Sequence, residues 1–232
     1  MTTEILTIDK GQCLTDVLPA IPANTIFDKT ITGCGATHSE IVNAARHSII
    51  IEPNIPVILG KKAEHPFLFA VYEGITKEDV KAYLAGEHDG YRKIITTPEG
   101  FDKKVLPAMH ELEIPVYKDY FLLFDECEKA IQDVGYRGDI YLPVEDFFKF
   151  ENKAMVSATP IVPSDPRFEE NGFKILKLVP TYDSRIELTL CTTNNTVAVM
   201  RKLLKRLENE TVCVTDPFHI KTLFFRIGSV PL

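Results

Sequence analysis

A short run of large apolar residues that ends in two adjacent carboxylates constrains the fold of this chain most. The segment FLLFDECEKA spans residues 121–130, and its acids are Asp125 and Glu126. A continuous apolar run of this length is typical of a strand buried on both faces of a parallel sheet. Because open α/β sheets bind ligands at the carboxyl ends of their strands, the two acids are predicted to face such a crevice.

Two carboxylates at a strand end can serve chemistry or helix stability. The first can hold a hydrated Mg²⁺ while the second orients or deprotonates a water molecule. Alternatively, both belong to the acidic first turn of a helix, where they complement the helix dipole. The run alone leaves both interpretations open.

The composition excludes several classes of protein. The chain has 232 residues, of which 45% are hydrophobic and 25% charged, enough for a good core. A net charge of -7 argues against a wholly basic nucleic-acid coat protein but not against a local basic groove. No apolar run approaches the ~20 residues of a membrane helix, and the N-terminus lacks the pattern of a signal peptide. The five cysteines form no CxxC pair, which predicts free thiols in a cytoplasmic protein.

Strand-like and helix-like segments alternate along most of the chain. The predicted strands span residues 24–31, 48–53, 66–74, 93–101, 120–124, 152–160 and 173–180. Residues 54–62 are interpreted as a short extension of the strand before them. Helices are predicted over 75–86, with a capping box at Thr76 and Asp79, and from residue 98 to about residue 111. The alternation predicts an α/β fold, a three-layer sandwich whose mostly parallel sheet is covered by helices on both sides.

The last part of the chain carries a weaker pattern. Prolines and charges in residues 161–172 form the strongest breaker signal and predict a domain boundary there. Beyond them, residues 186–193 and 211–216 alternate like strands around a helix predicted at 195–210. Residues 219–228 are interpreted as a final helical piece.

A glycine turn follows the first predicted strand. Residues 32–47 read TGCGATHSEIVNAARH, in which Gly33 and Gly35 allow a tight turn and Thr37 or Ser39 can cap the next helix. Strand, glycine turn and helix in this order place backbone N–H groups around a phosphate. Right-handed crossovers would bring this turn to the same sheet edge as the two acids. We therefore predict the site at that edge.

These motifs resemble those of the superfamily 2 (DExD/H-box) helicases. TGCGAT is similar to their phosphate-binding Walker A motif, commonly TGSGKT, FLLFDECE to their DExx box, and MVSATP to their SAT motif. The resemblance covers roughly residues 24–182. It implies a RecA-like P-loop NTPase fold, with residues 1–182 as the first lobe of the helicase and 183–232 as the truncated start of the second.

The resemblance also implies an ATP site with Mg²⁺. Thr37 and Asp125 would bind the metal ion, and Glu126 would be the catalytic residue that positions the attacking water. The residues implied to wrap the phosphates form the glycine turn: Gly33, Cys34, Gly35, Ala36 and Thr37.

Two further pairs of residues follow from the same resemblance. Ser157 and Thr159 would couple the nucleotide to motion of the lobes. Thr97 and Pro98 lie where the family contacts the nucleic-acid backbone, so DNA or RNA is the expected partner.

One departure from the family pattern concerns charge. Ala36 stands where the Walker A motif has a lysine that supplies a cation to the phosphates. A charge-assisted hydrogen bond contributes about 1.5–3 kcal/mol, so the loss is substantial. Either the site is degenerate and binds nucleotide weakly or not at all, or Lys29 turns toward the phosphates as a displaced cation. We favour the degenerate site.

The second departure concerns length. The residues after 183 stop before any arginine-rich late motif, so unwinding by this chain alone is not expected. A missing second lobe or a protein partner would complete such a site. The sequence thus predicts a helicase-like nucleotide-binding protein, a nucleic-acid-dependent ATPase with a weakened phosphate site. The alternative is a catalytically inactive helicase-fold module that binds nucleic acid or a protein partner.

Overall fold

The computed structural model divides the chain into two compact units, residues 1–183 and 184–232. In the first unit it describes residues 1–31, 33–127, 144–158 and 165–183. In the second it describes residues 191–192, 195–204, 212–214, 222–223 and 225–227. The predicted coupling residue Thr159 lies outside these ranges.

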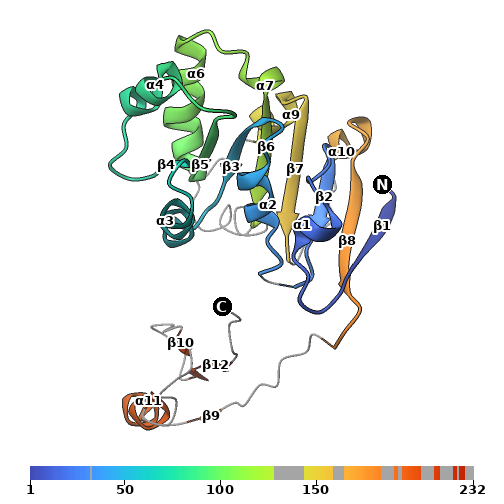
Figure 1. The fold of residues 1–232 in the computed structure, drawn as a ribbon, viewed down its shortest axis with the longest axis vertical. Coiled ribbons are helices and arrows are strands. Elements are labelled where there is room, and N and C mark those ends of the chain that lie inside the picture. Colours follow the sequence, from blue (N-terminus) through green and yellow to red (C-terminus); the bar gives the residue numbers. More distant parts are fainter. Residues whose placement is uncertain are drawn as a thin grey trace. The chain divides into compact units, whose positions relative to one another are not determined.

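One parallel sheet organises the first unit (Figure 1). Its eight strands are β1 (Thr3–Ile8), β2 (Thr25–Asp28), β3 (His47–Ile51), β4 (Phe69–Val71), β5 (Lys93–Thr96), β6 (Tyr120–Asp125), β7 (Asn152–Ser157) and β8 (Lys174–Pro180). They lie in the order β1-β8-β2-β7-β6-β3-β5-β4. Every strand pairing in this sheet is parallel. The predicted α/β class and parallel sheet are confirmed.

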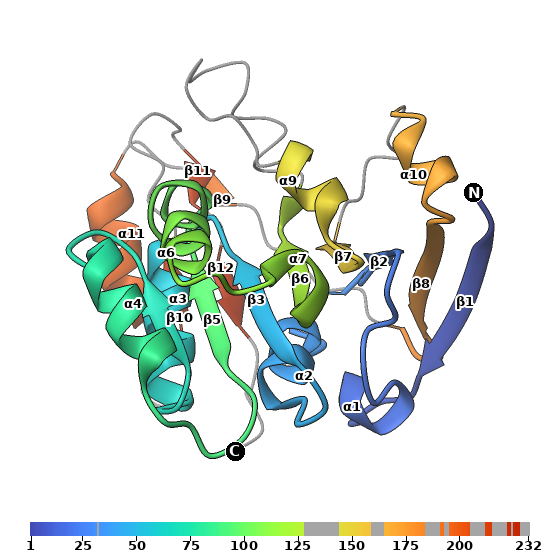
Figure 2. The same cartoon turned by 90° about the horizontal axis from the view of Figure 1, so that it is seen from above.

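Helices cover both faces of the sheet. In chain order they are α1 (Leu14–Val17), α2 (Ala36–Val42), α3 (Ile55–Glu64), α4 (Lys77–Ala85), α5 (Pro98–Gly100), the π-helical η1 (Phe101–Val105), α6 (Leu106–Glu111), α7 (Val116–Asp119), α9 (Val144–Lys149) and α10 (Arg167–Glu170). One buried cluster contains side chains of α1, α2 and α3, and the other contains side chains of α4, η1, α6, α7, α9 and α10. Figure 2 shows the same elements from above, with β1 and β8 at one end of the sheet. The result is a three-layer sandwich, consistent with a RecA-like fold.

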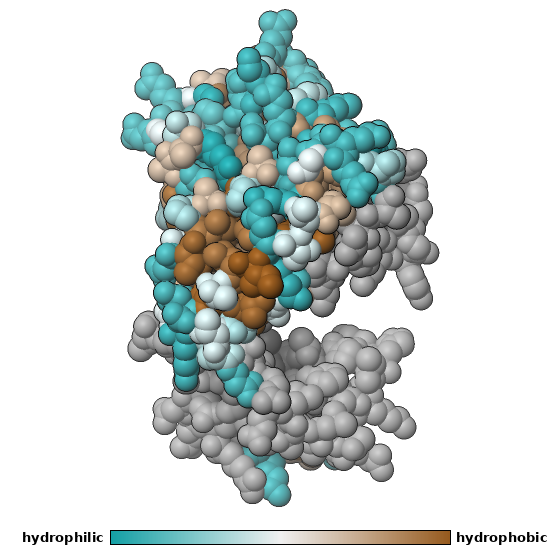
Figure 3. Space-filling model, turned by 90° about the vertical axis from the view of Figure 1, so that its right-hand side faces the viewer, coloured by the Kyte–Doolittle hydropathy of each residue, from teal (hydrophilic) through white to brown (hydrophobic). Residues whose placement is uncertain are grey.

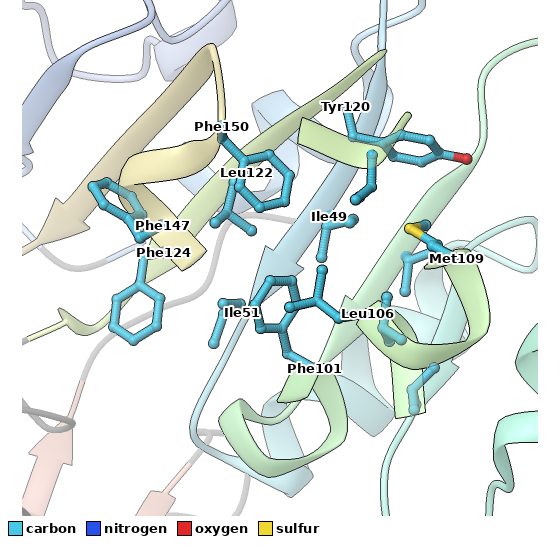
Figure 4. Close-up of a cluster of buried hydrophobic side chains, with 14 of the residues drawn as sticks. Ile49, Ile51, Phe101, Leu106, Met109, Tyr120, Leu122, Phe124, Phe147 and Phe150 are labelled. Atoms are coloured by element: carbon cyan, nitrogen blue, oxygen red, sulfur yellow. The ribbon is translucent and has the colours of Figure 1, made fainter. Parts of the chain in front are cut away.

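The central strands are apolar at nearly every position because both of their faces are covered. In β3, Ile49 and Ile51 join one buried cluster and Ile50 joins the other, as the two-residue period of a strand requires. Figure 4 shows the first of these clusters, where Phe101 and Leu106 lie close to the strands. Fully burying a side chain of this size stabilises the fold by about 1.5–3 kcal/mol. This explains why an unbroken apolar run predicted β6.

The two helices that were predicted with start signals, over residues 75–86 and from residue 98, are present in the structure. The Thr76 hydroxyl accepts the backbone N–H of Asp79 at 3.1 Å, and the Asp79 carboxylate accepts the N–H of Thr76 at 2.8 Å. The capping box is therefore confirmed. The helix predicted from residue 98 to about residue 111 is also present, as α5, η1 and α6 in succession.

The strand extension predicted at residues 54–62 is wrong. These residues begin α3, with Asn54 as the N-cap and a proline in the first turn. Proline is tolerated there because the first helical N–H groups have no partner within the helix. Ile58 is buried whereas Ile55 and Leu59 are 36% and 44% exposed, which is the pattern of a helix with one buried face.

An edge strand and a connection were also misinterpreted. β1 was not predicted because it pairs on one side only, with β8, and exposes most of its side chains. Ile5 of β1 is 69% exposed. Figure 3 shows the face of the molecule that lies on the right in Figure 1, where apolar side chains gather in one patch. The domain boundary predicted at residues 161–172 is wrong, because β8 pairs with both β1 and β2 and the chain divides after residue 183. The strands before and after this stretch, β7 and β8, belong to one sheet.

The second unit contains α11 (Thr196–Leu204) and two short antiparallel pairings. β9 (Cys191–Thr192) pairs with β11 (Thr222–Leu223), and β10 (Val212–Val214) pairs with β12 (Phe225–Ile227). The helical piece predicted at 219–228 is wrong for the described residues, which form strands. Their threonine, phenylalanine and isoleucine favour extended structure. That this unit begins a second helicase lobe stays a prediction.

Candidate functional site

Three adjacent strands bring the predicted motifs to one edge of the sheet. β2, β7 and β6 are neighbours and parallel, so their carboxyl ends meet at the same edge. β2 leads into the glycine turn, β7 ends at Ser157, and β6 ends at Asp125. Ser157 is fully buried, and its carbonyl oxygen accepts the backbone N–H of Lys29 at 2.9 Å.

A lysine lies between the two carboxylates. Lys29 is the first residue after β2, and its Nζ is 3.3 Å from Oδ1 of Asp125 and 2.6 Å from Oε1 of Glu126. The Lys29 side chain is 10% exposed and that of Asp125 is 3% exposed. Glu126 adopts a left-handed backbone conformation with φ of 51°. This chain turn directs its carboxylate toward the ammonium group.

The Lys29 ammonium stabilises both carboxylates and is stabilised by them. Burial on its own would lower the pKa of Lys29, but the carboxylates of Asp125 and Glu126 outweigh burial and raise that pKa. Lys29 is therefore a permanent cation at neutral pH. The sequence suggested Lys29 as a cation for the phosphates. In the structure its Nζ instead contacts the carboxylates of Asp125 and Glu126.

The glycine turn touches the same acids. Gly33 and Gly35 have φ of 76° and 89°, in the left-handed region where a residue with a Cβ atom is strained. α2 begins at Ala36, within the predicted turn segment, and Gly35 is its N-cap, so neither predicted capping residue caps it. The Thr37 hydroxyl instead donates a hydrogen bond to Oδ2 of Asp125. Cys34 is 7% exposed, and burial raises the pKa of its thiol, which therefore stays protonated at neutral pH.

A pocket of about 170 Å³ opens beside the turn. It is lined by Lys29, Gly33, Cys34, Gly35, Ala36, Thr37, His38 and Lys61. Lys61 reaches it from α3, where its Nζ also lies 2.9 Å from Oε2 of Glu64. Sequence reasoning missed Lys61 because it assigned this segment to a strand. Two lysine side chains, Lys29 and Lys61, therefore line the pocket, and Ala36 lies where the resemblance implies a lysine.

A third carboxyl group lies at the same edge. Glu52 is the first residue after β3, is 1% exposed, and accepts hydrogen bonds from the N and Nδ2 atoms of Asn54 at 2.8 and 2.7 Å. Burial, reinforced by the negative charge of Asp125, raises the pKa of Glu52 to about 7. Its position directly after a buried strand is the signal that identified Asp125, and the same reasoning would have found Glu52.

A buried ionic network fixes α2 and hence the glycine turn. The fully buried Glu40 accepts hydrogen bonds from Arg46 Nε at 3.0 Å and from Ser48 Oγ at 2.5 Å. Lys93 Nζ donates to the Glu40 carbonyl at 2.9 Å and to Ser48 Oγ at 2.8 Å. These contacts join α2 to the starts of β3 and β5.

Thr97 and Pro98 follow β5 and are both buried. The Thr97 hydroxyl accepts the backbone N–H of Gly100 at 3.0 Å, which makes Thr97 the N-cap of α5. Thr97 is 9% exposed. The hydroxyl thus has a structural role, and contact with DNA or RNA stays a prediction.

Thr97→Ala is expected to lower the free energy of unfolding by about 1 kcal/mol, because the variant loses the cap of α5. Thr97→Ser keeps the hydroxyl and should retain most of the stability. Urea denaturation followed by circular dichroism measures both. Equal losses in the two variants would assign the effect to the methyl group instead of the cap.

With Lys29 between the two carboxylates, the described side chains of the site are not arranged to bind a divalent metal ion. Among the residues that the structure describes, no group of three or more His, Cys, Asp or Glu side chains is arranged to hold a metal ion. The Lys29 ammonium already contacts both the Asp125 and the Glu126 carboxylates, and Thr37 donates to Asp125. A metal ion bound by Asp125 and Thr37, as the resemblance implies, would have to displace the Lys29 ammonium.

No protein-family model matches this chain, and no curated protein matches it. In the described part of the chain, none of the helices is both long enough and apolar enough to cross a membrane. The residues of the site therefore carry the functional interpretation.

Proposed function

We propose that this chain is a helicase-like nucleotide-binding protein that takes the phosphates of ATP into the pocket beside the glycine turn. The observation that supports this most is the contact between the turn and the acids, made by the Thr37 hydroxyl and Asp125. Glycines with positive φ expose backbone N–H groups without steric hindrance, which suits an anion. DNA or RNA is the proposed macromolecular partner.

Two lysines supply the charge that the turn itself lacks. Lys29 and Lys61 both line the pocket, from the end of β2 and from α3. Charge-assisted hydrogen bonds contribute about 1.5–3 kcal/mol each, so two of them replace much of what the Walker A lysine would provide. A pocket of about 170 Å³ is smaller than the ~300 Å³ or more of typical whole-ligand sites. It suits phosphate groups, with the ribose and base outside it.

The position of Lys29 favours a protein that binds ATP without hydrolysing it. Glu126, the proposed base, lies 2.6 Å from Lys29 Nζ and is neutralised by it. A carboxylate paired in this way is a poor acceptor for the proton of an attacking water, because protonating it breaks the ion pair. This observation favours the second candidate function, a helicase-fold module that binds nucleotide and nucleic acid or a protein partner without hydrolysis.

Lys61→Ala is expected to raise the Kd for ATP by about tenfold or more, which corresponds to the loss of one charge-assisted contact. The matched control is Lys62→Ala, because Lys62 is the next residue of α3 and donates to the Pro66 carbonyl at 2.7 Å, away from the pocket lining. Isothermal titration of the full chain measures both. A wild-type chain that does not bind ATP, or equal effects of the two variants, would contradict the proposed site.

Hydrolysis is tested separately. Release of phosphate that is stimulated by DNA or RNA and abolished in Glu126→Gln would establish an ATPase. Binding without phosphate release, unchanged in Glu126→Gln, would establish the non-catalytic module.

A further inference from the structure

We propose that the Lys29 ammonium is the resident cation of the Asp125–Glu126 pair, so that this chain binds nucleotide phosphates without a divalent metal ion. The second half of this inference rests on the proposed function. The first half, which concerns the metal site, can be tested without any nucleotide.

The geometry places Lys29 where a metal ion would bind. Its Nζ is within 3.3 Å of Oδ1 of Asp125 and 2.6 Å of Oε1 of Glu126. Mg²⁺ binds carboxylate oxygens, directly at about 2.0–2.1 Å or through its own water molecules. An ammonium in contact with both carboxylates excludes such an ion by volume and by repulsion between like charges.

Lys29 is held in this position by more than its ion pairs. Its backbone N–H donates to the Ser157 carbonyl at 2.9 Å, so the main chain is tied to β7 at the root of the side chain. The side chain is 10% exposed. Moving the ammonium away would leave Asp125, which is 2% exposed, as a buried charge with less compensation.

The other contacts of the Asp125 carboxylate are hydrogen bonds from the protein. The Thr37 hydroxyl donates to Oδ2, and the backbone N–H of Glu126 donates to Oδ1 at 3.0 Å. Both oxygens of the carboxylate therefore accept hydrogen bonds from the protein. An ammonium group has three N–H donors, so Lys29 would keep its two carboxylate contacts and donate its remaining N–H to a phosphate, and Lys61 would donate a second hydrogen bond.

The test of the metal site uses Mn²⁺ as a spectroscopic substitute for Mg²⁺, added to the full chain without nucleotide. Lys29→Met removes the ammonium and keeps an unbranched side chain. We expect Lys29→Met to bind Mn²⁺ at least about tenfold more tightly than the wild type, measured by loss of the free Mn²⁺ signal in electron paramagnetic resonance. Lys177→Met is the matched control, because Lys177 lies on β8, three places from β6 in the strand order, and its Nζ pairs with Asp28 at 3.7 Å. It should bind Mn²⁺ as the wild type does.

A second measurement does not depend on the folding of a variant. The Tm of the wild-type chain is expected to be the same in EDTA and in millimolar Mg²⁺, because a ligand that binds the folded state would raise it. A Tm that rises with Mg²⁺, a wild-type chain that binds Mn²⁺ as tightly as Lys29→Met, or a Lys29→Met chain that gains no Mn²⁺ site would overturn the proposal.

The nucleotide experiment separates the two proposals. The wild-type Kd for ATP is expected to agree within about twofold in EDTA and in Mg²⁺, whereas Lys29→Met should lose about tenfold or more in EDTA and recover in Mg²⁺. Wild-type binding that requires Mg²⁺ would overturn metal independence. If ATP is bound in neither condition, the proposed function fails and the Mn²⁺ result still decides the role of Lys29.

Discussion

Glu40→Ala is expected to lower the free energy of unfolding by about 3–5 kcal/mol, because it breaks a buried ionic network and leaves its cations unpaired. The Glu40 carboxylate accepts hydrogen bonds from Arg46 Nη2 at 2.5 Å and Nε at 3.0 Å, and Lys93 Nζ lies 3.6 Å from it. Lys93 is 3% exposed. Burial lowers the pKa of Lys93 to about 8 even with the Glu40 carboxylate present. Without that carboxylate, the folded state would have to hold either an uncompensated ammonium group or a deprotonated Lys93, and both states cost stability.

Denaturation by urea, followed by circular dichroism, measures this loss. Glu4→Ala is the control, because Glu4 pairs with Lys174 at 3.0 Å on the exposed edge strand β1. An exposed ion pair contributes about 0–1 kcal/mol, so this variant should stay close to the wild type. If Glu40→Ala loses no more stability than Glu4→Ala, the network does not anchor α2.

Loss of the Glu40 network is also expected to disturb the pocket, because Glu40 lies in α2. Glu40 lies in the same short helix as Ala36 and Thr37, which line the pocket. A helix of 7 residues has little stability of its own, so tertiary contacts hold it in place. We therefore regard the Glu40 network as the anchor of the glycine turn.

The elements that were predictable from the sequence are those whose signal is local. β6 follows from an apolar run, α4 from a capping box, and the glycine turn from two residues that tolerate positive φ. The shared edge follows from parallel strands and right-handed crossovers. Each of these inferences uses neighbours in the sequence and one general rule of chain geometry.

The remaining features depend on contacts between residues far apart in the sequence. The apolar residues of α3 resemble a strand in isolation, and only the burial of Ile58 against the sheet shows their helical face. Because α3 was misassigned, Lys61 could not be placed at the pocket. The contact of Lys29 with the acids spans 96 and 97 residues and depends on the strand order β2-β7-β6. A sequence motif identifies residue types but does not determine which charge lies against which.

Glu52 is expected to give the stability of this chain a distinct dependence on pH. Burial raises its pKa from an ordinary 4.5 to about 7. Between these values the folded chain keeps a proton that the unfolded chain releases, so stability falls as pH rises. The full cost of ionising Glu52 in the folded state is about 3 kcal/mol and is reached above about pH 7. Below about pH 4.5 the group is protonated in both states and contributes no such cost.

Glu52→Gln should remove this dependence, because the amide oxygen still accepts hydrogen bonds from Asn54 and carries no charge. The free energy of unfolding of Glu52→Gln minus that of the wild type is expected to increase by about 3 kcal/mol between about pH 4.5 and about pH 8. Glu4→Gln, on the exposed edge strand, is the control and should show no comparable increase. A constant difference between Glu52→Gln and the wild type would mean that Glu52 ionises at an ordinary pH. Since Asp125 contributes to the raised pKa of Glu52, such a result would also weaken the close electrostatic coupling between the ends of β3 and β6.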